Sequence, residues 1–448
     1  MIPMTLAEIA AVVDGVAHGV ARVSAPASLD SRSVETGGLF VALAGEHVDG
    51  HDYVESAIEN GAATALTSRP VGDAPVVEVD DVTVALSLLA RHVLHEVRPK
   101  VIAITGSQGK TGVKDMLAQL LEADYPTVAT AGNFNNELGV PLTVLRIVES
   151  TEYLVVEMGA RGIGDIARLC EIAPPDIAVV LNVGHAHIGE FGSVENIARA
   201  KGELVEALKP DGIAVLNADD PLVAAMAERT TGRVAWFGRN ARNPEDVTIL
   251  DVTMTPSGEP DVTLAWEDDV DTVHVPLLGE HQAVNLAAAH RTLLTLGILE
   301  ATLWATDLQS LSPHRMQRHV RDDGLVVIDD AYNANPEAMA AALHALAGVG
   351  GGRRVAVLGE MLELGDGSHD SHVEVGRLAA ELGVDRVVAV GTGAAAIAEG
   401  AGDRGTAVAD VDEALRELSA WLTPTDVVLV KASRGVRLER VTEALLGG

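Results

Sequence analysis

A short glycine-rich stretch is the first part of this sequence that suggests chemistry. Residues 105–111 read TGSQGKT and stand between an apolar run and a helical pattern. In a loop of this kind the backbone N–H groups bind phosphate oxygens, Lys110 reaches the terminal phosphates and the Thr111 hydroxyl binds Mg²⁺. The strict G-x-x-x-x-G-K spacing is not met, because Ile104 occupies the first glycine position. We therefore predict a nucleotide site, with a plain strand-to-helix turn as the alternative.

Three further residues have side chains suited to metal binding. Glu157 ends the apolar run in YLVVEMG, and a carboxylate at a strand end beside a phosphate loop is a natural Mg²⁺ ligand. His187 follows another apolar run, in NVGHAHIGEFGS, and Lys201 lies one helical segment later. Each also has an ordinary interpretation, respectively a solvated strand end, a loop histidine and a cation on a helix face.

Lys201 stands out because this chain uses little lysine. It lies in the alanine-rich helical stretch IARAKGELVEAL, where arginine would serve equally well as a solvated cation. The residues alone leave open whether the amine is there by chance or for a reaction that arginine cannot undergo. Lysine and arginine together number 32, and the lysines are Lys100, Lys110, Lys114, Lys201, Lys209 and Lys431.

The bulk composition excludes several classes of protein. With 448 residues the chain exceeds one hydrophobic core, so two or three domains are expected. A formal charge of −33 argues against a nucleic-acid-binding or anionic-membrane surface, and no apolar run approaches the roughly 18 residues that span a membrane. Cys170 is the only cysteine and the first residues lack a signal-peptide pattern. We therefore expect a cytoplasmic protein without a disulfide.

The apolar runs predict an α/β fold in three domains. Val/Ile/Leu runs alternate with helical patterns through residues 99–311 and again through 312–448, as in parallel sheets covered by helices. Residues 245–278 alternate apolar and polar side chains, as antiparallel hairpins do. Shorter strand and helix patterns occupy residues 1–98, and VRPK at 97–100 is predicted to be a linker. These three ranges are the expected domains.

Polar residues at the ends of other predicted elements are further candidates. GNFNNELGVPLT has too little apolar content to be core, and Asn285 lies in the first turns of a helix, where it binds a base edge or satisfies local backbone. HRMQ and IDDAYNANP open the third segment. VKASRG places Lys431 and Arg434 at the end of the last predicted strand, where an anionic ligand fits. Pairing with neighbouring acids is the alternative for these two cations.

Together these residues resemble the Mur ligases of bacterial cell-wall synthesis, along essentially the whole chain. DSRSVETGGLFVALAGEHVDGHDYVESAIENGA resembles the uridine-nucleotide-binding domain of that family. TGSQGKT, GNFNNELGVPLT, VVEMGA and AHIGEFGSVENIARAKGE resemble its central ATPase domain. HRMQ, IDDAYNANPEAM, LGEMLELG and VKASRG resemble its C-terminal ligase domain. The resemblance implies a small α/β N-terminal domain, a central P-loop domain with a parallel sheet, and a C-terminal Rossmann-like α/β domain.

The resemblance implies an ATP-dependent amide ligase of peptidoglycan precursor synthesis, serving cell-wall biogenesis, cell shape, cell division and the cell cycle. The carboxylate of UDP-MurNAc-tripeptide would attack the γ-phosphate of ATP, and the amine of D-Ala-D-Ala would attack the resulting acyl phosphate. YNANPEAM and GEMLELG point to this pair of substrates, since the Asp-Asn-Pro-Arg motif of MurE is not found. A MurE-like or MurT-like ligase is the first alternative, and a non-catalytic P-loop binding protein is the second.

The resemblance also implies roles for individual residues. Lys110, Glu157, His187 and Lys201 would be catalytic. Thr111 and Glu157 would hold one Mg²⁺, and His187 and Lys201 a second, after the Lys201 amine has reacted with CO₂ to become a carbamate. Arginine, permanently protonated, cannot do this. The residues implied for ATP are Thr105, Gly106, Ser107, Gln108, Gly109, Lys110, Thr111, Asn136, Asn285, Arg315 and Asp329.

The substrates are expected to bind in the two outer domains, and the chain is expected to act as a monomer. Three departures from the family pattern occur: Gln108 in the loop, His314 where glycine usually precedes the arginine, and a shift at Gly189 that leaves the role of Glu190 open. The implied substrate residues are Ser31, Arg32, Gly45, Asp49, Gly50 and His51 in the first domain, and Tyr332, Asn333, Asn335, Lys431 and Arg434 in the third.

Overall fold

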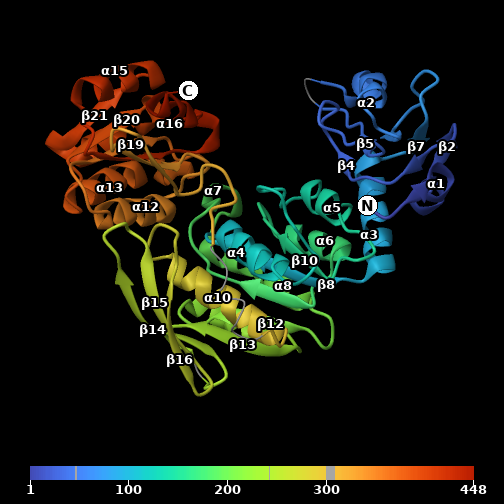
Figure 1. Cartoon of the computed structure of the whole chain (residues 1–448), viewed down its shortest axis with the longest axis horizontal. Helices are drawn as coiled ribbons and strands as arrows, with labels where there is room; N and C mark the ends of the chain where they lie inside the picture. Colours follow the sequence, from blue (N-terminus) through green and yellow to red (C-terminus); the bar gives the residue numbers. More distant parts are fainter. Residues whose placement is uncertain (46–47, 242, 299–307, 448) are drawn as a thin grey trace.

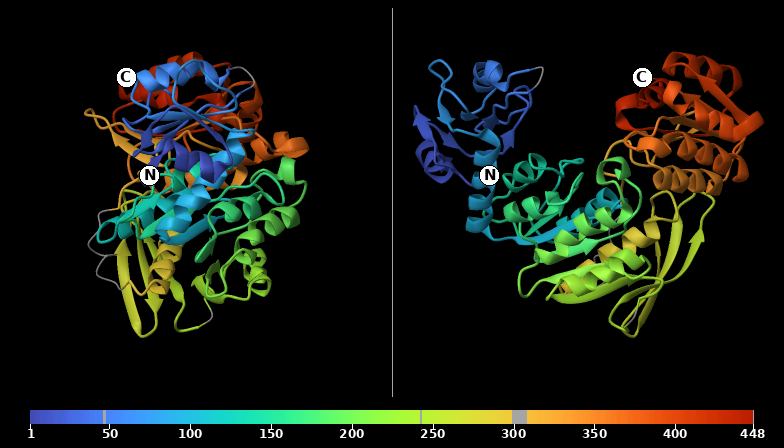
Figure 2. Two further views of the ribbon diagram at one scale, coloured as in Figure 1. Left: turned by 90° about the vertical axis from the view of Figure 1, so that its right-hand side faces the viewer. Right: turned by 180° about the vertical axis from the view of Figure 1, so that it is seen from behind.

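The computed structural model describes residues 1–448 except 46–47, 242, 299–307 and 448. Three large sheets, each with its own helices, follow one another along the chain, and a small two-stranded sheet of β1 (Met4–Thr5) and β3 (Arg22–Val23) adjoins the first. Figure 1 shows a broad U, in which the N-terminal and C-terminal parts form two arms on either side of the central sheet. The view from behind in Figure 2 shows the same separation of the arms. The α/β class and the three-part organisation predicted from the sequence are confirmed.

The N-terminal arm is a small five-stranded sheet with helices, and its last helix reaches the central part. That helix, α3 (Val82–Val97), begins at Asp81, whose side chain accepts hydrogen bonds from the Thr83 and Val84 amides. Strand β8 starts at Lys100, so the predicted linker is reduced to Arg98 and Pro99. In order across the sheet, the strands are β2 (Val16–His18), β7 (Val76–Glu78), β6 (Thr64–Thr67), β5 (Leu39–Val41) and β4 (Ala27–Ser28), and the other helices are α1 (Leu6–Val13) and α2 (Val54–Glu59).

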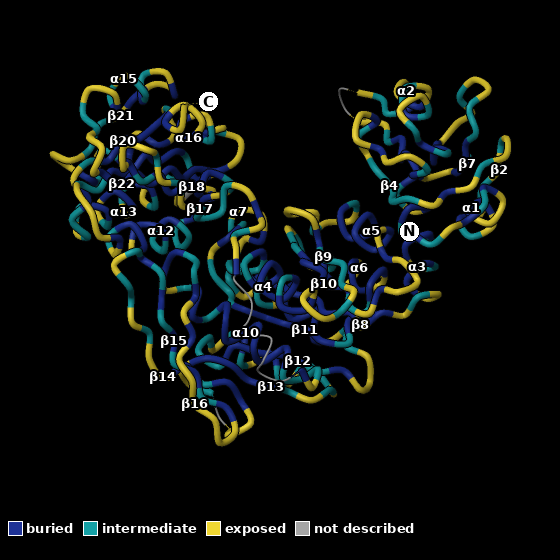
Figure 3. The backbone as a smooth tube through the Cα atoms, viewed as in Figure 1, coloured by how far each residue is buried: buried dark blue, intermediate teal, exposed yellow. Residues whose placement is uncertain are grey.

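The central part is a nine-stranded sheet whose middle strands are buried apolar runs (Figure 3). Its strands from β9 to β14 pair in parallel, and β14, β15 and β16 pair antiparallel, as the alternating pattern predicted. Across the sheet they are β16 (Asp269–His274), β15 (Pro260–Trp266), β14 (Val247–Met254), β13 (Arg233–Gly238), β12 (Ile213–Asn217), β11 (Ile177–Val180), β8 (Lys100–Thr105), β10 (Tyr153–Glu157) and β9 (Thr127–Ala129).

The C-terminal arm is a six-stranded sheet that is parallel except at one edge, where β17 pairs antiparallel with β18. Its strands are β17 (Gln317–Val320), β18 (Val326–Asp330), β22 (Val427–Lys431), β19 (Arg354–Gly359), β20 (Arg386–Val390) and β21 (Gly405–Val408), in that order. Its helices are α12 (Pro336–Gly348), α13 (Ser368–Glu381), α14 (Ala395–Ala401), α15 (Val411–Trp421) and α16 (Glu439–Leu446).

Strand β8 marks the place where the central sheet can hold a ligand. Its neighbours are β10 on one side and β11 on the other, so the chain winds in opposite directions from it. In such parallel sheets the loops at the carboxyl ends separate at this point and leave a crevice. Glu157 pairs with Ile104, and Val180 with Thr105, so the three strands end side by side. Among the described residues, no helix is long and apolar enough to cross a membrane.

Candidate active site

The glycine loop joins β8 to α4 (Lys110–Glu122) and has the backbone of a phosphate-binding turn. Gly109 precedes the helix with φ 81°, a left-handed conformation that favours glycine. A Cβ there would also lie 2.7 Å from Asn285 Oδ1. Lys110 Nζ donates to the Gly106 carbonyl at 2.8 Å, so the side chain folds back over the loop. Burial, opposed by Glu157 and reinforced by Arg315, lowers the Lys110 pKa.

Asn182, which the sequence reasoning missed, braces this loop. Its carbonyl accepts a hydrogen bond from the Ser107 amide at 3.0 Å, and its Oδ1 accepts one from the Gln108 amide at 2.8 Å. Its Nδ2 donates to the Gln108 carbonyl at 3.1 Å. A polar residue directly after the β11 apolar run was the only available signal. Thr105 also has a structural partner, since its buried hydroxyl donates to the Met158 carbonyl at 2.9 Å.

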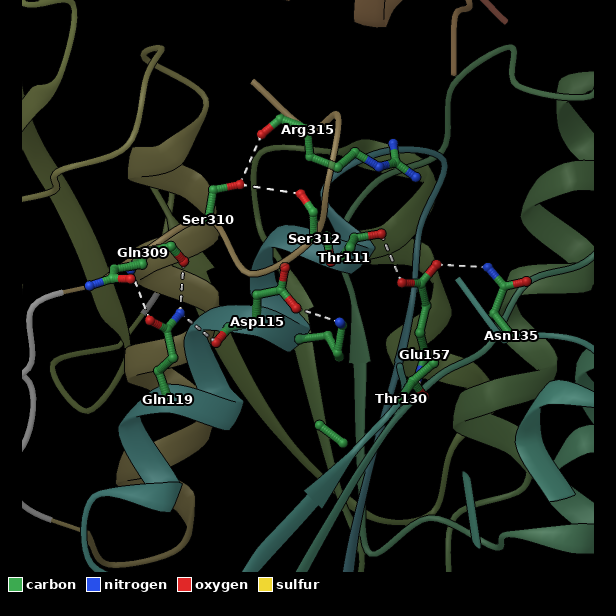
Figure 4. Close-up of polar contacts among 12 residues, drawn as sticks. Thr111, Asp115, Gln119, Thr130, Asn135, Glu157, Gln309, Ser310, Ser312 and Arg315 are labelled. Atoms are coloured by element: carbon green, nitrogen blue, oxygen red, sulfur yellow. Dashed lines mark hydrogen bonds and ion pairs between the residues drawn. The ribbon is translucent and has the colours of Figure 1, made fainter. Parts of the chain in front are cut away.

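Glu157 lies beside the loop with both carboxylate oxygens engaged (Figure 4). Oε2 accepts from the Thr111 hydroxyl at 2.9 Å and Oε1 from Asn135 Nδ2 at 2.7 Å, and the side chain is buried. Asn135 is therefore the asparagine of its loop that reaches the carboxylate. The Oδ1 of the predicted Asn136 instead accepts hydrogen bonds from the Leu138 and Gly139 amides, in the turn that leads into α5 (Gly139–Val144). Both asparagines line the cavity described below.

His187 and Lys201 both lie close to Lys110 of the loop. His187 has φ 61° and precedes the short helix α7 (Ile188–Phe191), while Lys201 lies within α8 (Val194–Glu206). The His187 Nδ1 contacts the Glu363 carboxylate of the C-terminal arm, which leaves Nε2 for another ligand. Burial lowers the His187 pKa against the opposing effect of Glu363. Lys110 and Lys201 add to the lowering because both lie close by.

The Lys201 amine is in an unusual environment for a cation. The residue is buried at 6% exposure, and burial, reinforced by Lys110, lowers its pKa well below the ordinary lysine value. Within the described part of the chain, no hydrogen-bond acceptor or carboxylate pairs with this amine. A lowered pKa increases the neutral, nucleophilic form of an amine. The solvated helix-face interpretation of Lys201 is therefore wrong, because the side chain faces the interior.

A cavity of about 1060 Å³ collects most of the predicted residues of the central and C-terminal parts. The cavity lies between these two parts, and side chains from both of them line it. Gly106, Ser107 and Gln108 line it, whereas Thr105 does not, and Asp330 lines it in place of the predicted Asp329. The other predicted residues in its wall are Gly109, Lys110, Thr111, Asn136, Glu157, His187, Lys201, Asn285, Arg315, Tyr332, Asn333, Asn335, Lys431 and Arg434.

Several contacts hold the C-terminal arm against the phosphate loop. His185 Nδ1 lies 2.5 Å from Glu337 Oε1, and the His185 amide donates to the same oxygen at 2.9 Å. Gln108 Nε2 donates to Asn335 Oδ1 at 3.4 Å, and Asn335 also caps the start of α12.

Asn285 Nδ2 donates to a neighbouring glutamine, Gln282, at 2.9 Å. The asparagine therefore has a local partner and packs against the loop glycines.

The two basic residues of the last strand segment differ in their surroundings. Lys431 is buried, its Nζ lies 2.6 Å from Asp330 Oδ2, and burial lowers its pKa against the effect of that carboxylate. The predicted alternative, pairing with a neighbouring acid, is thus what Lys431 does. Arg434 is exposed, and its Nη1 donates to the Tyr332 hydroxyl at 3.1 Å. Within the described chain no carboxylate pairs with Arg434, so its positive charge is available to an anionic ligand.

The N-terminal candidates lie in the other arm and outside this cavity (Figure 1). The Arg32 side chain is 85% exposed and pairs with Asp30 at 2.8 Å, while the Ser31 carbonyl accepts from Asn60. Asp49 Oδ1 lies 2.6 Å from the Nδ1 of the buried His51, and Asp49 Oδ2 accepts from Arg69 at 2.9 Å. Gly50 lies so close to the Leu43 backbone that a Cβ would approach it at 2.7 Å, and the Gly45 amide donates to Val48. A ligand common to both regions must span the U.

The side chains suit one metal ion better than a second. Thr111 and Glu157 offer a hydroxyl and a carboxylate, the hard oxygen donors that Mg²⁺ takes. His187 and Lys201 offer only nitrogens, so a second Mg²⁺ requires an oxygen ligand that unmodified lysine lacks. Across the described residues, no group of three or more His, Cys, Asp and Glu side chains is arranged to hold a metal ion.

Comparison with known proteins agrees with this geometry. Family models match the Mur ligase catalytic domain at residues 27–97, the middle domain at 104–293 and the glutamate ligase domain at 314–434. The UDP-N-acetylmuramoyl-tripeptide–D-alanyl-D-alanine ligase of Mycobacterium tuberculosis is 43% identical, covering 100% of this chain and 98% of its own. A crystal structure of MurF from Acinetobacter baumannii superposes with a TM-score of 0.89 at 33% identity, covering 100% and 99% of the two chains. MurF from Thermotoga maritima in complex with ADP has a TM-score of 0.80 at 34% identity, over 94% and 96%.

Proposed function

This chain belongs to the Mur ligase family, and on that premise we propose that it uses ATP to join D-Ala-D-Ala to UDP-MurNAc-tripeptide in peptidoglycan precursor synthesis. The observation that carries the proposal is the cavity in which the glycine loop, Glu157 and Lys201 meet Arg315 and Arg434 of the C-terminal arm. A ligase must bring a nucleotide and two further substrates together. In a cavity between two domains, residues of both domains can hold these molecules in contact with one another.

The reaction needs activation because a carboxylate is a poor acyl donor. The tripeptide carboxylate attacks the γ-phosphorus of ATP, ADP leaves, and an acyl phosphate forms. The dipeptide amine then attacks the acyl carbon, the tetrahedral intermediate collapses, and phosphate departs with an amide left behind. Lys110 holds the β and γ phosphates, and Arg315 adds a second positive charge to the same group. Together these cations stabilise the charge that develops on the transferred phosphoryl group.

Mg²⁺ would be held by Thr111 and Glu157, and a second ion by His187 and the carbamate of Lys201. Bound there, Mg²⁺ neutralises phosphate charge and supplies electrophilic assistance. Two observations support the carbamate: the Lys201 amine is buried without a partner in the described chain, and its pKa is lowered. A neutral amine reacts with CO₂, and the product carries the oxygens that this metal site lacks.

The three sheets suggest a division of labour among domains bounded at 1–98, 99–311 and 312–448. The first would bind the uridine nucleotide through Ser31, Arg32, Gly45, Asp49, Gly50 and His51. The second would bind ATP, with Asn136 and Asn285 in its wall and Asn285 next to the base. Tyr332, Asn333, Asn335 and Arg434 of the third would receive the dipeptide. Lys431 would organise this wall through Asp330, and Asp329 would act through His314, 2.7 Å away.

Further parts of the proposal follow from the same premise. The enzyme would work as a monomer in the cytoplasm, and its product would support cell-wall biogenesis, cell shape, division and the cell cycle. A MurE-like or MurT-like ligase would also use this cavity but would accept a diamino acid or ammonia. A non-catalytic nucleotide-binding protein would have no need for the buried amine of Lys201 beside His187.

A phosphate-release assay with a panel of acceptors tests the proposal. The purified chain is incubated with ATP, Mg²⁺ and UDP-MurNAc-tripeptide, and then with D-Ala-D-Ala, a diamino acid or ammonia. We expect phosphate release and a pentapeptide product, seen by mass spectrometry, only with the dipeptide. A product with the diamino acid or ammonia instead would reassign the substrate, and binding of ATP without any product would support the non-catalytic alternative.

A further inference from the structure

One face of α4 connects the phosphate loop to the chain that enters the C-terminal arm. Thr111, Asp115 and Gln119 are spaced four residues apart, so they lie on the same face of the helix. Thr111 is at the Glu157 end of that face, and Gln119 is two turns further along (Figure 4). Opposite Gln119 lies Gln309, at the start of the segment that continues to Arg315.

The Gln119 amide forms a two-point clamp on this segment. Its Oε1 accepts a hydrogen bond from the Gln309 backbone amide at 2.8 Å, and its Nε2 donates to the Gln309 carbonyl at 2.9 Å. Nε2 also donates to the Asp115 carbonyl at 3.0 Å, within its own helix. Both N–H groups and the oxygen of this side chain are therefore used, and on Gln309 only the backbone is bound.

The segment between Gln309 and Arg315 is held in a tight conformation. Ser310 Oγ donates to the Arg315 carbonyl at 3.1 Å, which closes the turn. The residues on either side of Arg315, His314 and Met316, have φ of 58° and 50°, left-handed values that are costly for side chains with a Cβ. Such strain persists only where the surroundings hold it in place.

Two aspartates of β18 supply that support from the C-terminal side. Asp329 Oδ2 lies 2.7 Å from His314 Nδ1, and Asp330 Oδ1 accepts from the Met316 amide at 3.2 Å. Arg315 is thus carried by a segment anchored at one end to α4 and at the other to the C-terminal sheet. Its side chain stacks over Tyr332 at 4.2 Å and extends above Thr111 in Figure 4. It is also close enough to Lys110 to affect that ammonium electrostatically.

We infer that Gln119 is a positioning residue for ATP use. By fixing the Gln309 backbone to the helix that carries Lys110 and Thr111, it sets where Arg315 stands relative to the phosphates. The inference rests on the proposed function in one respect, the assignment of Arg315 to the phosphates of ATP. Gln119 itself does not line the cavity, so its effect must pass through Arg315.

Gln119→Glu is the sharpest variant because it changes one atom and little volume. Its remaining carboxylate oxygen can still accept from the Gln309 amide, but the other faces two carbonyls that have lost their donor. We expect kcat/KM for ATP to fall about tenfold, while KM for the UDP-substrate stays within about twofold. Gln309→Ala is the comparison variant, since it keeps the bound backbone and removes an exposed side chain at the wall of the cavity. Its loss in kcat/KM for ATP should be clearly smaller than that of Gln119→Glu.

A double-mutant cycle separates a positioning role from a general loss of structure. In an Arg315→Ala background, Gln119→Glu should cost less than about twofold, because the residue through which it acts is gone. Full additivity of the two losses, or wild-type kinetics for Gln119→Glu, would overturn the inference. Should that variant not fold, as judged by thermal melting, Gln119→Met removes both contacts without a new charge and takes its place in the cycle.

ATP affinity by titration calorimetry keeps this test apart from the proposed function. If the wild type binds ATP but makes no ligation product, the proposed function fails. The clamp is then judged by the ATP dissociation constants of the same four proteins, which should show the same tenfold loss and the same lack of additivity.

Discussion

Thr111 Oγ1 donates a hydrogen bond to Glu157 Oε2 at 2.9 Å, and so links the first turn of α4 to the end of β10. The same carboxylate accepts from Asn135 at 2.7 Å. A buried carboxylate with these partners is oriented before any ion arrives, and orientation of ligands by neighbouring groups strengthens a metal site. This arrangement lets us predict the effect of removing only the negative charge of Glu157.

Glu157→Gln should keep the side-chain shape and lose the charge. We expect turnover to fall by at least about a hundredfold, the size of effect seen when one electrostatic partner of a transition state is removed. Melting temperature should change little, because the amide oxygen can still accept from Thr111 and a flip of the Asn135 amide turns its oxygen toward the new NH₂ group. Steady-state rates across a Mg²⁺ titration provide the measurement, and an unaltered Mg²⁺ dependence would exclude Glu157 as a ligand.

Lys110→Ala should abolish turnover by removing the charge-assisted contact to the β and γ phosphates. The fold should survive, since the one hydrogen bond of the Lys110 ammonium among the described residues is to the Gly106 carbonyl. ATP affinity by calorimetry and turnover by phosphate release are the two measurements. A folded variant with near-normal turnover would show that nucleotide binds somewhere other than this loop.

Arg32→Ala should separate the two nucleotides that the proposal assigns to different domains. Arg32 is exposed in the N-terminal arm and does not line the cavity between the other two parts. We expect KM for the UDP-substrate to rise about tenfold, the loss of one or two charge-assisted hydrogen bonds, with KM for ATP unchanged. Equal effects on both constants, or on neither, would contradict a uridine-nucleotide site in residues 1–98.

Arg434 and Lys431 should respond differently to removal, because among the described residues Lys431 pairs with a carboxylate and Arg434 contacts only the Tyr332 side chain. Arg434→Ala should raise KM for the dipeptide and leave stability near that of the wild type. Lys431→Ala leaves the Asp330 carboxylate buried without its partner, a change that costs about 3–5 kcal/mol of folding stability. Dipeptide kinetics and urea unfolding of both variants give the comparison. Reversed outcomes would assign the ligand to Lys431 instead.

Lys201 is tested by chemistry rather than by charge. Lys201→Ala should still bind ATP but fail to form the acyl phosphate, and formate or acetate should partly restore turnover by supplying oxygens to the cavity. Lys201→Arg should also fail, because guanidinium does not take up CO₂. Depleting bicarbonate should slow the wild type, and adding it back should recover the rate. A fully active Lys201→Arg enzyme would leave the carbamate without support.

Local patterns in the sequence determined the elements and the order of the three parts. The Val/Ile/Leu runs became parallel strands, and the alternating residues 245–278 became hairpins, because burial on one or two faces of a sheet leaves a period that can be read directly. The phosphate loop could be predicted for a similar reason. The glycine in a left-handed conformation and the lysine that folds back over the loop are neighbours in one short stretch of sequence.

Only the tertiary structure decided which side chains meet. In the folded protein Asn135, and not Asn136, is the partner of Glu157. Lys431 pairs with Asp330, and Glu363 contacts His187. The N-terminal candidate residues lie in the other arm of the U and do not line the cavity. These relationships join residues far apart in the chain. They depend on strand order and on how the domains pack, and neither of these leaves a period in the sequence.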